Sequence, residues 1–371
     1  MFQDRHDVLP EATHDEFARE EFCSSLRKMF TTELWPANRA LYHQQMLPAF
    51  VEKNGREPAN FSEVKDLMAE SLYFRAVNAI GRTTQEMLWD TVGESVERQI
   101  GTLVEKAKPR PNALGTVRVN PALAMPRYID AVDIHVMPGN FHTELAEDDV
   151  FAGALYDRGV YVFAFGGLGK CNQNLGVVTA DFFRERFPDK KPRRILDMGC
   201  GPGFSTLPWK DLYPDAEVYA IDLAAPQIRY AAARAESMGK AIHFSQQDAC
   251  HTDFPDGYFD IVVSVLVTHE MPVPAIKAMY KEGHRLLAPG GVMMHDGGYP
   301  EAKTDFDLLM AAWFGMHANE PFSAGFRAMD QDKAMLQGGF AQEQLFRGQR
   351  AAVYLKGQLP PACFVGAVKE G

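Results

Sequence analysis

One stretch, RILDMGCGPGFSTLPW from Arg194 to Trp209, constrains the fold of this chain more than any other. A short apolar run leads directly into a loop with glycine at three alternate positions, Gly199, Gly201 and Gly203. Glycines let the backbone approach a ligand closely and adopt positive φ values, and the following helix offers unpaired N–H groups. The spacing differs from the G-x-G-x-x-G of dinucleotide-binding loops, which disfavours NAD as the ligand.

The same stretch opens a regular alternation of strands and helices. Beyond RRILDMG, four strands are predicted at AEVYAIDLA, AIHFSQQDA, FDIVVSVLV and GVMMHDG. FDIVVSVLV is apolar throughout, as expected of a central strand buried on both faces. MLQGGFAQEQLFRG and AAVYLKGQL are predicted to supply the last two strands. Residues 191–371 are therefore predicted to form an α/β domain around a mainly parallel sheet.

Residues 1–125 follow a different pattern and are predicted to form a mainly α-helical N-terminal domain. Apolar residues recur there at three- and four-residue steps, and Ser62 is the candidate N-cap of one helix. This apolar stripe is interpreted either as a helical core or as the face of a homodimer. Four prolines between Pro109 and Pro126 exclude a long helix at the end of this region. Residues 126–190 are predicted to be a connector and lid segment.

Acidic residues follow the second and third predicted strands. Asp222 ends the second strand, where a carboxylate can accept hydrogen bonds from the hydroxyls of a ribose. Asp248 follows the third strand, where it can accept a hydrogen bond from an adenine amino group. Each acid alone is more often a helix cap or a turn residue. Because the carboxyl ends of parallel strands form the ligand crevice, the two acids together predict a ligand that carries adenosine.

Five segments in this order, ILDMGCGPG, AIDLA, QQDA, FDIVVSVLVTHE and LLAPGGVMM, resemble the motifs of class I S-adenosylmethionine-dependent methyltransferases. Asp197 to Gly203 matches the D-x-G-x-G-x-G loop of that family. The resemblance implies a Rossmann-like seven-stranded domain, S-adenosyl-L-methionine as cofactor and S-adenosyl-L-homocysteine as product. The cofactor-binding residues that it implies are Asp197, Gly199, Gly201, Gly203, Asp222, Leu223, Asp248, Ala249 and Val265.

The catalytic residues that the resemblance implies are His269 and Glu270, in VTHEMP at the end of the fourth strand. Plant-type small-molecule O-methyltransferases carry a catalytic histidine followed by an acid at this place. The likeness implies His269 as general base and slightly favours oxygen over nitrogen, sulfur or carbon as the acceptor atom. A histidine that only shapes the pocket is the alternative. Glu270 either orients His269 or begins the next helix with a favourable charge.

Acceptor-binding residues are expected outside the motifs. The candidates are Tyr156, Tyr161, His295, Trp313 and His317, with core packing as the alternative for each aromatic residue and a structural His295–Asp296 pair for the histidine. His135 and His142 lack the spacing of a metal site, and the five scattered cysteines supply no metal framework. We therefore predict a small-molecule acceptor and no metal.

The composition of the chain argues against nucleic acid and membrane as binding partners. A formal net charge of −11 argues against nucleic-acid binding, and THEMP lacks the N/D-P-P-Y/F turn of enzymes that methylate amino groups of nucleic acids. No apolar run reaches the roughly 20 residues of a membrane span, and the polar start and scattered cysteines predict a cytoplasmic protein. The alternatives to a methyltransferase are an inactive binding protein of the same fold and, third, a dehydrogenase.

Overall fold

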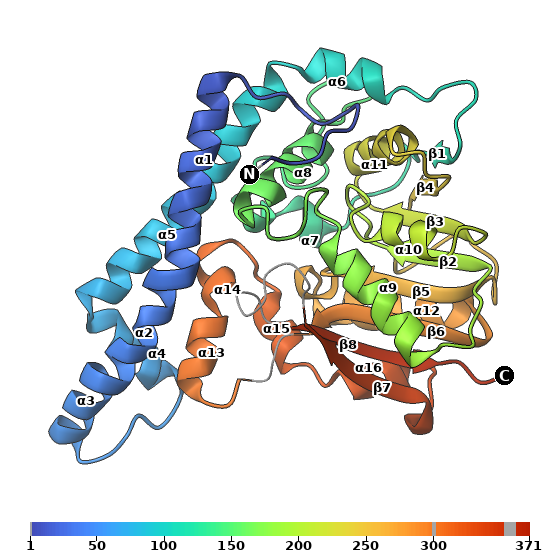
Figure 1. Ribbon diagram of the computed structural model, residues 1–371. Helices are drawn as coiled ribbons and strands as arrows, with labels where there is room; N and C mark the ends of the chain where they lie inside the picture. Colours follow the sequence, from blue (N-terminus) through green and yellow to red (C-terminus); the bar gives the residue numbers. More distant parts are fainter. Residues whose placement is uncertain (1, 299–301, 352–360) are drawn as a thin grey trace.

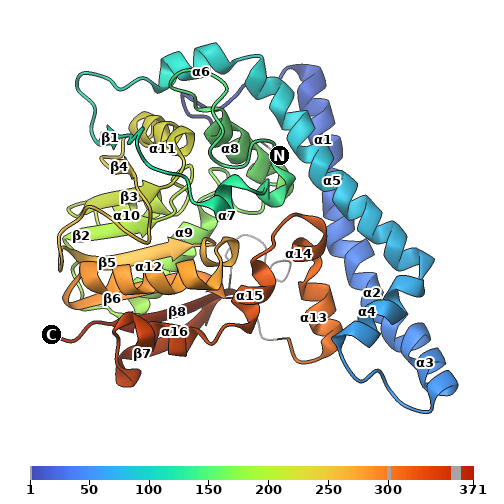
Figure 2. The same ribbon diagram turned by 180° about the vertical axis from the view of Figure 1, so that it is seen from behind.

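The computed structural model describes residues 2–298, 302–351 and 361–371 of the chain (Figure 1). An α/β unit built around one sheet lies beside a long arm of helices from the N-terminal region, and both views show the arm reaching past the sheet (Figures 1 and 2). None of the described helices has the length and apolar character needed to cross a membrane.

The sheet has eight strands in the order β1-β4-β3-β2-β5-β6-β8-β7. All neighbouring strands are parallel except β8, which runs antiparallel to both β6 and β7. The strands are β1 (Thr116–Arg118), β2 (Arg194–Met198), β3 (Glu217–Asp222), β4 (His243–Gln246), β5 (Phe259–Val265), β6 (Leu287–Gly298), β7 (Leu345–Arg350) and β8 (Ala362–Val368).

Helices cover both faces of the sheet because alternate side chains of each strand point to opposite faces. Ile195 of β2 belongs to an apolar cluster with α9, α10 and α11, whereas Leu196 belongs to a second cluster with α12 and α16. Figure 2 shows α12 on the face opposite to α9. The helices of this unit are α8 (Phe151–Phe163), α9 (Asn174–Arg186), α10 (Thr206–Leu212), α11 (Ala225–Ser237), α12 (Val273–Leu286) and α16 (Gln331–Gly338).

The N-terminal region is helical, as predicted. Its longest helix, α5, packs against α1 and α8 and thereby joins the arm to the α/β unit. The cap of α4 is Asn60, which accepts a hydrogen bond from the backbone N–H of Glu63, so the assignment of Ser62 was wrong. The helices are α1 (His14–Met29), α2 (Trp35–Leu41), α3 (Leu47–Asn54), α4 (Phe61–Glu70), α5 (Leu72–Glu97), α6 (Ile100–Ala107) and the short α7 (Arg127–Asp130).

Three short helices follow β6, namely α13 (Asp305–Ala311), α14 (Trp313–His317) and α15 (Ser323–Ala328). α13 packs against α4, and α14 contacts α5. Both views place this insert between the sheet and the helical arm (Figures 1 and 2). The insert therefore packs against helices that precede it by more than 200 residues of sequence.

The sheet differs in detail from the prediction. β1 adds an eighth strand beside β4 and comes from the segment before residue 125. β7, Leu345–Arg350, begins at the end of the predicted stretch MLQGGFAQEQLFRG and extends two residues beyond it. The predicted strand AAVYLKGQL lies almost entirely outside the described residues, and the structure describes a strand, β8, at Ala362–Val368. The limits of the three predicted regions, 1–125, 126–190 and 191–371, stay a prediction.

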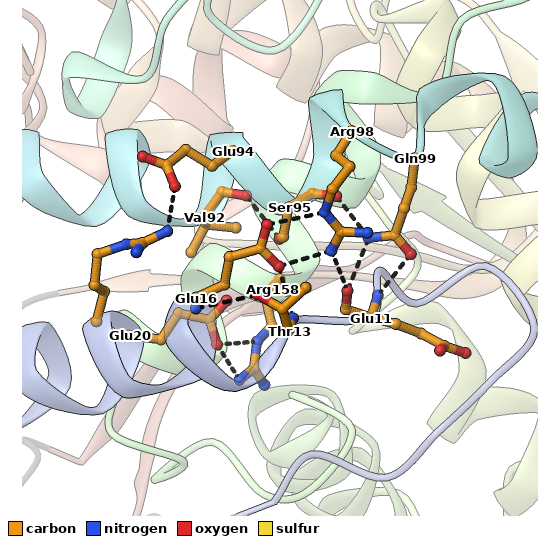
Figure 3. A network of polar contacts seen from close by, with 11 residues as sticks. Glu11, Thr13, Glu16, Glu20, Val92, Glu94, Ser95, Arg98, Gln99 and Arg158 are labelled. Carbon is orange, nitrogen blue, oxygen red and sulfur yellow. Dashed lines mark hydrogen bonds and ion pairs between the residues drawn. The ribbon is translucent and has the colours of Figure 1, made fainter.

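Charged side chains join α1 to α5 and α8 (Figure 3). Glu16 accepts hydrogen bonds from the Arg98 guanidinium, which lowers the pKa of Glu16 to about 2. Glu20 accepts a hydrogen bond of 3.1 Å from Nε of Arg158, and both side chains are buried. Because an unpaired charge is costly in a dry environment, the pair of Glu20 and Arg158 holds α1 on α8.

Removing one member of this buried pair should destabilise the protein strongly. Arg158→Ala leaves the carboxylate of Glu20, 1% exposed, without its partner, and we expect a loss of about 3–5 kcal/mol in the free energy of unfolding. The control Arg19→Ala removes a half-exposed ion pair with Glu94 and should change stability by less than about 1 kcal/mol. Urea unfolding measures both, and equal small losses would contradict the assignment.

Candidate active site

A cavity opens at the carboxyl ends of the central strands. It is lined by the loop after β2, by the ends of β3, β4 and β5, and on the other side by α7, α8 and the segment before α9. The cavity holds about 1190 Å³ of space, its mouth included. A crevice at this edge of a parallel sheet is where open α/β folds bind their ligands.

The glycine loop forms one wall of the cavity. Gly199, Gly201 and Gly203 have φ values of 74°, 48° and 81°, which residues other than glycine rarely adopt. A Cβ atom at Gly199 would lie 2.5 Å from Cγ2 of Val267, whereas at Gly201 it would meet no protein atom within 4 Å. Gly199 and Gly201 line the cavity, and Gly203 lies against Leu207 at the start of α10. The loop therefore offers a ligand bare backbone at Gly201.

Asp197 supports this loop from behind. Its side chain is fully buried and accepts hydrogen bonds from the hydroxyls of Ser205, at 2.6 Å, and Thr206, at 2.7 Å. Burial raises the pKa of Asp197 to about 6. Asp197 is not among the lining residues, so any effect on a ligand passes through the loop.

Asp222 and Asp248 both line the cavity, together with the predicted residues Leu223, Ala249 and Val265. Asp222 accepts hydrogen bonds of 2.9 Å from the backbone N–H groups of Gly201 and Ala224. Burial raises the pKa of Asp222 to about 6, against the effect of these N–H groups. Asp248 accepts a hydrogen bond of 2.8 Å from the N–H of Cys250. The structure thus brings together the two acids and the loop, although 21 and 47 residues separate the acids from Gly201.

Two amide side chains complete this end of the cavity and carry no motif in the sequence. Asn172 and Gln227 line the cavity and are 2% and 1% exposed. Their amide groups donate to the backbone carbonyls of Asp157 and Ala152, while Asn172 Oδ1 and Gln227 Oε1 have no partner among the described residues. Buried polar atoms are rarely left unsatisfied. The two oxygens therefore suit hydrogen-bond donors of a ligand.

The turn Thr268–Glu270 after β5 places Glu270 on the cavity and His269 behind it. His269 is buried, with Nε2 at 3.8 Å from Oε1 of Glu270, and burial lowers the pKa of His269. Oε1 of Glu270 lies 3.0 Å from Nε2 of His135, whose Nδ1 lies 3.1 Å from Oε1 of Glu320. Two carboxylates can be satisfied by one imidazole only if both ring nitrogens carry hydrogen.

His135 is held in this position by strained backbone and by α5. Its φ is 58°, and its carbonyl accepts hydrogen bonds from Nε2 of Gln85 and Nε1 of Trp89, at 2.9 and 2.8 Å. Burial lowers the pKa of His135, but the hydrogen bonds to Glu270 and Glu320 outweigh burial and raise it to about 10. His135 is therefore an imidazolium between two carboxylates at neutral pH.

Comparison with known proteins gives the family of the central region. Residues 195–291 match the model of a protein family that is described as a methyltransferase domain. They form a class I S-adenosylmethionine-dependent methyltransferase domain. The prediction drawn from the glycine loop and the four later motifs is confirmed, as is the Rossmann-like fold behind a helical region.

The curated relatives resemble the methyltransferase domain and part of its surroundings. A demethylmenaquinone methyltransferase of Thermus thermophilus is 36% identical over 126 residues, which cover 34% of this chain and 56% of the relative. A malonyl-[acyl-carrier protein] O-methyltransferase of Enterobacter lignolyticus is 31% identical over 171 residues, 45% of this chain and 63% of the relative. The chain thus spans less than two thirds of the length of either relative.

Among solved structures, phosphoethanolamine N-methyltransferase 2 of Haemonchus contortus in complex with S-adenosyl-L-methionine is 16% identical to this chain, with a TM-score of 0.45. The alignment covers 58% of this chain and 57% of that structure.

The predicted acceptor residues are mostly remote from the cavity of the methyltransferase domain. Tyr156 lines it, with its ring stacked on Phe204 at 6.1 Å. The other four pack against side chains that do not line the cavity: Tyr161 lies under the Arg158 guanidinium, His295 stacks on Tyr280, Trp313 lies against Phe30 and Trp35, and the half-buried His317 lies beside Trp313. Burial lowers the pKa of His295 to about 3.

A cluster near the cavity brings together groups that often bind metals. Donor atoms of His135, His269 and Glu320 lie within 4.8 Å of one another. Both nitrogens of His135 are engaged by carboxylates, which accounts for its place in the cluster without an ion. We assign no metal ligands here.

The imidazolium of His135 should make stability depend on alkaline pH. Because its pKa is about 6.5 when unfolded and about 10 when folded, its contribution is complete below pH 6.5 and is lost as pH rises toward 10. Glu320→Gln removes one of its two carboxylates. We expect this variant to be less stable than the wild type by on the order of 3 kcal/mol at pH 6.5.

Urea unfolding at pH 6.5, 8 and 9.5 measures this effect. The stability difference between wild type and Glu320→Gln should shrink steadily as the pH rises. Glu105→Gln, on an exposed side chain of α6, serves as the matched control and should show no pH-dependent difference. A difference that stays constant over this range would show that His135 is not held as an imidazolium by Glu320.

Proposed function

We propose that the protein transfers a methyl group from S-adenosyl-L-methionine to a small-molecule acceptor and releases S-adenosyl-L-homocysteine. The observation that carries the proposal is the convergence, in one cavity of a methyltransferase domain, of bare backbone at Gly201, the Asp222 carboxylate and two unsatisfied amide oxygens. The donor supplies an electrophilic methyl group on a sulfonium, so the protein has to orient the reactants and exclude water.

The glycine loop and the acids at the strand ends would form the donor end of the cavity. Asp222 would accept hydrogen bonds from the ribose hydroxyls, and Asp248 with Ala249 would meet the adenine. The loop at Gly199 and Gly201 would lie against the amino-acid portion of the donor, with Asp197 holding the loop. The free oxygens of Asn172 and Gln227 would accept hydrogen bonds from donor N–H or O–H groups.

The acceptor end lies at Glu270, across the sheet edge from Asp248. His269 is not a lining residue, whereas Glu270, 3.8 Å from it, is, so Glu270 would be the group of this pair that meets an acceptor. The slight preference for an oxygen acceptor depended on His269 as base, and Glu270 takes that place here. The relatives are named for different acceptors, demethylmenaquinone and a malonyl carrier protein, so the acceptor atom has to be inferred from this cavity.

The homodimer predicted through the N-terminal helices stays a prediction. Phe22 of α1 and Leu72 at the start of α5 are 61% and 74% exposed, which supplies apolar surface for it. Multi-angle light scattering of the purified full chain tests it directly, since a monomer mass would contradict the dimer.

Calorimetry with S-adenosyl-L-methionine, S-adenosyl-L-homocysteine and NAD tests the proposed function. We expect the first two to bind and NAD not to bind. Binding of NAD alone would overturn the proposal. Donor binding without release of S-adenosyl-L-homocysteine over a broad panel of amines, alcohols and thiols would favour an inactive binding protein of the same fold.

Asp222→Asn should weaken donor binding. A charged hydrogen-bond acceptor contributes about 1.5–3 kcal/mol, so the Kd for S-adenosyl-L-homocysteine should rise roughly 10- to 100-fold. In the wild type, affinity should fall as pH decreases from 7.5 to 5, because Asp222 takes up a proton near pH 6. The variant should lack that part of the pH dependence. Asp211→Asn, at an exposed ion pair with Lys240, is the control, and equal affinities for both variants would refute the assignment.

A further inference from the structure

We propose that the methyl acceptor is an amine, which enters as an ammonium ion and binds between the Glu270 carboxylate and the aromatic rings of Phe141 and Tyr156. The inference rests on the proposed function and gives the chemical class of its acceptor.

The charge of the cavity is the first argument. Its lining includes three carboxylates, those of Asp222, Asp248 and Glu270, and no lysine, arginine or histidine within the described part of the chain. A carboxylate or phosphate on the acceptor would be repelled and would find no cation to pair with. A cationic acceptor gains from the same surroundings.

Glu270 is the carboxylate that the donor leaves available. Asp222 and Asp248 end β3 and β4 and accept backbone N–H groups there, at the place assigned to adenosine. Glu270 follows β5, on the other side of the glycine loop. The acceptor would therefore meet Glu270 without competing with the ribose or the adenine for a carboxylate.

Glu270 is also held in place. His135 donates to its Oε1 and is itself anchored by Glu320 and by two hydrogen bonds from α5 to its carbonyl. Arg327 acts electrostatically on Glu320 and on His269 and is not among the residues that line the cavity. The cluster therefore presents a fixed carboxylate to the cavity and keeps its cations behind it.

Aromatic rings lie near His135, the partner of this carboxylate, and Glu270 acts electrostatically on one of them, Tyr156. The ring of Phe141 lies 6.3 Å from the ring of His135, the partner of Glu270, and 5.3 Å from the ring of Tyr156. The ring of Tyr156 continues to Phe204, and all three aromatic residues line the cavity. Ammonium ions bind favourably over the faces of such rings, because the ring face carries negative charge density. A carboxylate beside aromatic faces is therefore suited to an alkylammonium group.

The chemistry also fits an amine. A neutral amine carries a nucleophilic lone pair, whereas a hydroxyl oxygen stays a weak nucleophile until a base removes its proton. The ammonium ion loses one proton to Glu270, which passes it to solvent. The nitrogen lone pair then forms the new N–C bond while the C–S bond breaks toward sulfur. The products are a methylated ammonium ion, a neutral thioether and one released proton.

Three probes of similar size and different polar ends test the inference: 2-phenylethylamine, 2-phenylethanol and 3-phenylpropanoate. Each is titrated by calorimetry into the full chain saturated with S-adenosyl-L-homocysteine at pH 7.5. We expect the amine to bind at least about 10-fold more tightly than the alcohol and the carboxylate to show no binding. An amine that fails to bind, or binds no better than either of the others, would overturn the inference.

Two variants locate the binding. Glu270→Gln should raise the Kd of the amine about 10-fold while leaving the Kd of S-adenosyl-L-homocysteine within about twofold. Phe141→Leu should raise the Kd of the amine more than that of the alcohol. Glu105→Gln is the matched charge control and should change neither. Unchanged amine affinity in Glu270→Gln would overturn the inference, and if that variant does not fold, the probe comparison and Phe141→Leu decide.

The same titrations separate this inference from the proposed function. Binding of S-adenosyl-L-homocysteine without any preference for the amine rejects the amine acceptor and leaves the methyl donor in place. Failure of both S-adenosyl-L-methionine and S-adenosyl-L-homocysteine to bind rejects the proposed function, and the acceptor class with it. Transfer is followed as release of S-adenosyl-L-homocysteine, with kcat/KM for the amine rising as the pH approaches the pKa of its ammonium ion.

Discussion

The paired hydrogen bonds of His135 hold together the part of the cavity that we propose as its acceptor end. One imidazolium joins Glu270, after β5, to Glu320, beyond α14, while the carbonyl of the same residue is bound by α5. Four segments from different parts of the chain thus meet at one residue. The acceptor end of the cavity consequently exists only when the N-terminal helices and the insert after β6 are both packed.

Two features of this arrangement are unfavourable for the free energy of folding. His135 has a left-handed backbone conformation, and its ring and both carboxylates are removed from most solvent. Strained conformations and buried charges persist only where the surroundings over-determine them. Here a charge pair on each side of the ring and two donors on the carbonyl do so. Such a site fixes the position of the Glu270 carboxylate, and it does so at some cost to the stability of the fold.

The donor end could be predicted from the sequence because its determinants are local. A strand that ends in a glycine loop, or in an acid, brings its ligand group to the sheet edge through its own geometry. Asp222 and Asp248 therefore reached the cavity as expected, and the family was recognised from segments of four to twelve residues. The three-residue strand β1 escaped prediction because so short a segment has no detectable alternation.

The acceptor end could not be predicted because its determinants are distant in sequence. Trp313 looked like an acceptor residue, yet its ring is buried against Phe30 and Trp35, a contact visible only once α14 and the N-terminal helices are in place. His135 and Glu320 are 185 residues apart, and neither lies in a motif. Their partner Glu270 was singled out with His269, but which of two adjacent residues faces the cavity depends on the rotation of one short turn.

The different origin of the two ends has a consequence for acceptor choice. The donor end depends mainly on backbone at Gly201 and on carboxylates at strand ends, which the sheet itself positions, and only its two amide side chains are held by α8. The acceptor end depends on residues that the arm and the insert position, namely His135 and Glu320 around Glu270. Substitutions in α5 or near α14 that displace His135 or Glu320 can therefore alter the charge and shape presented to the acceptor. Binding of the donor by the glycine loop and the strand-end carboxylates is not weakened by such a change. A fold of this kind can change its acceptor by repacking the segments around His135 and Glu320, while the sheet edge keeps the glycine loop and the strand-end carboxylates in place.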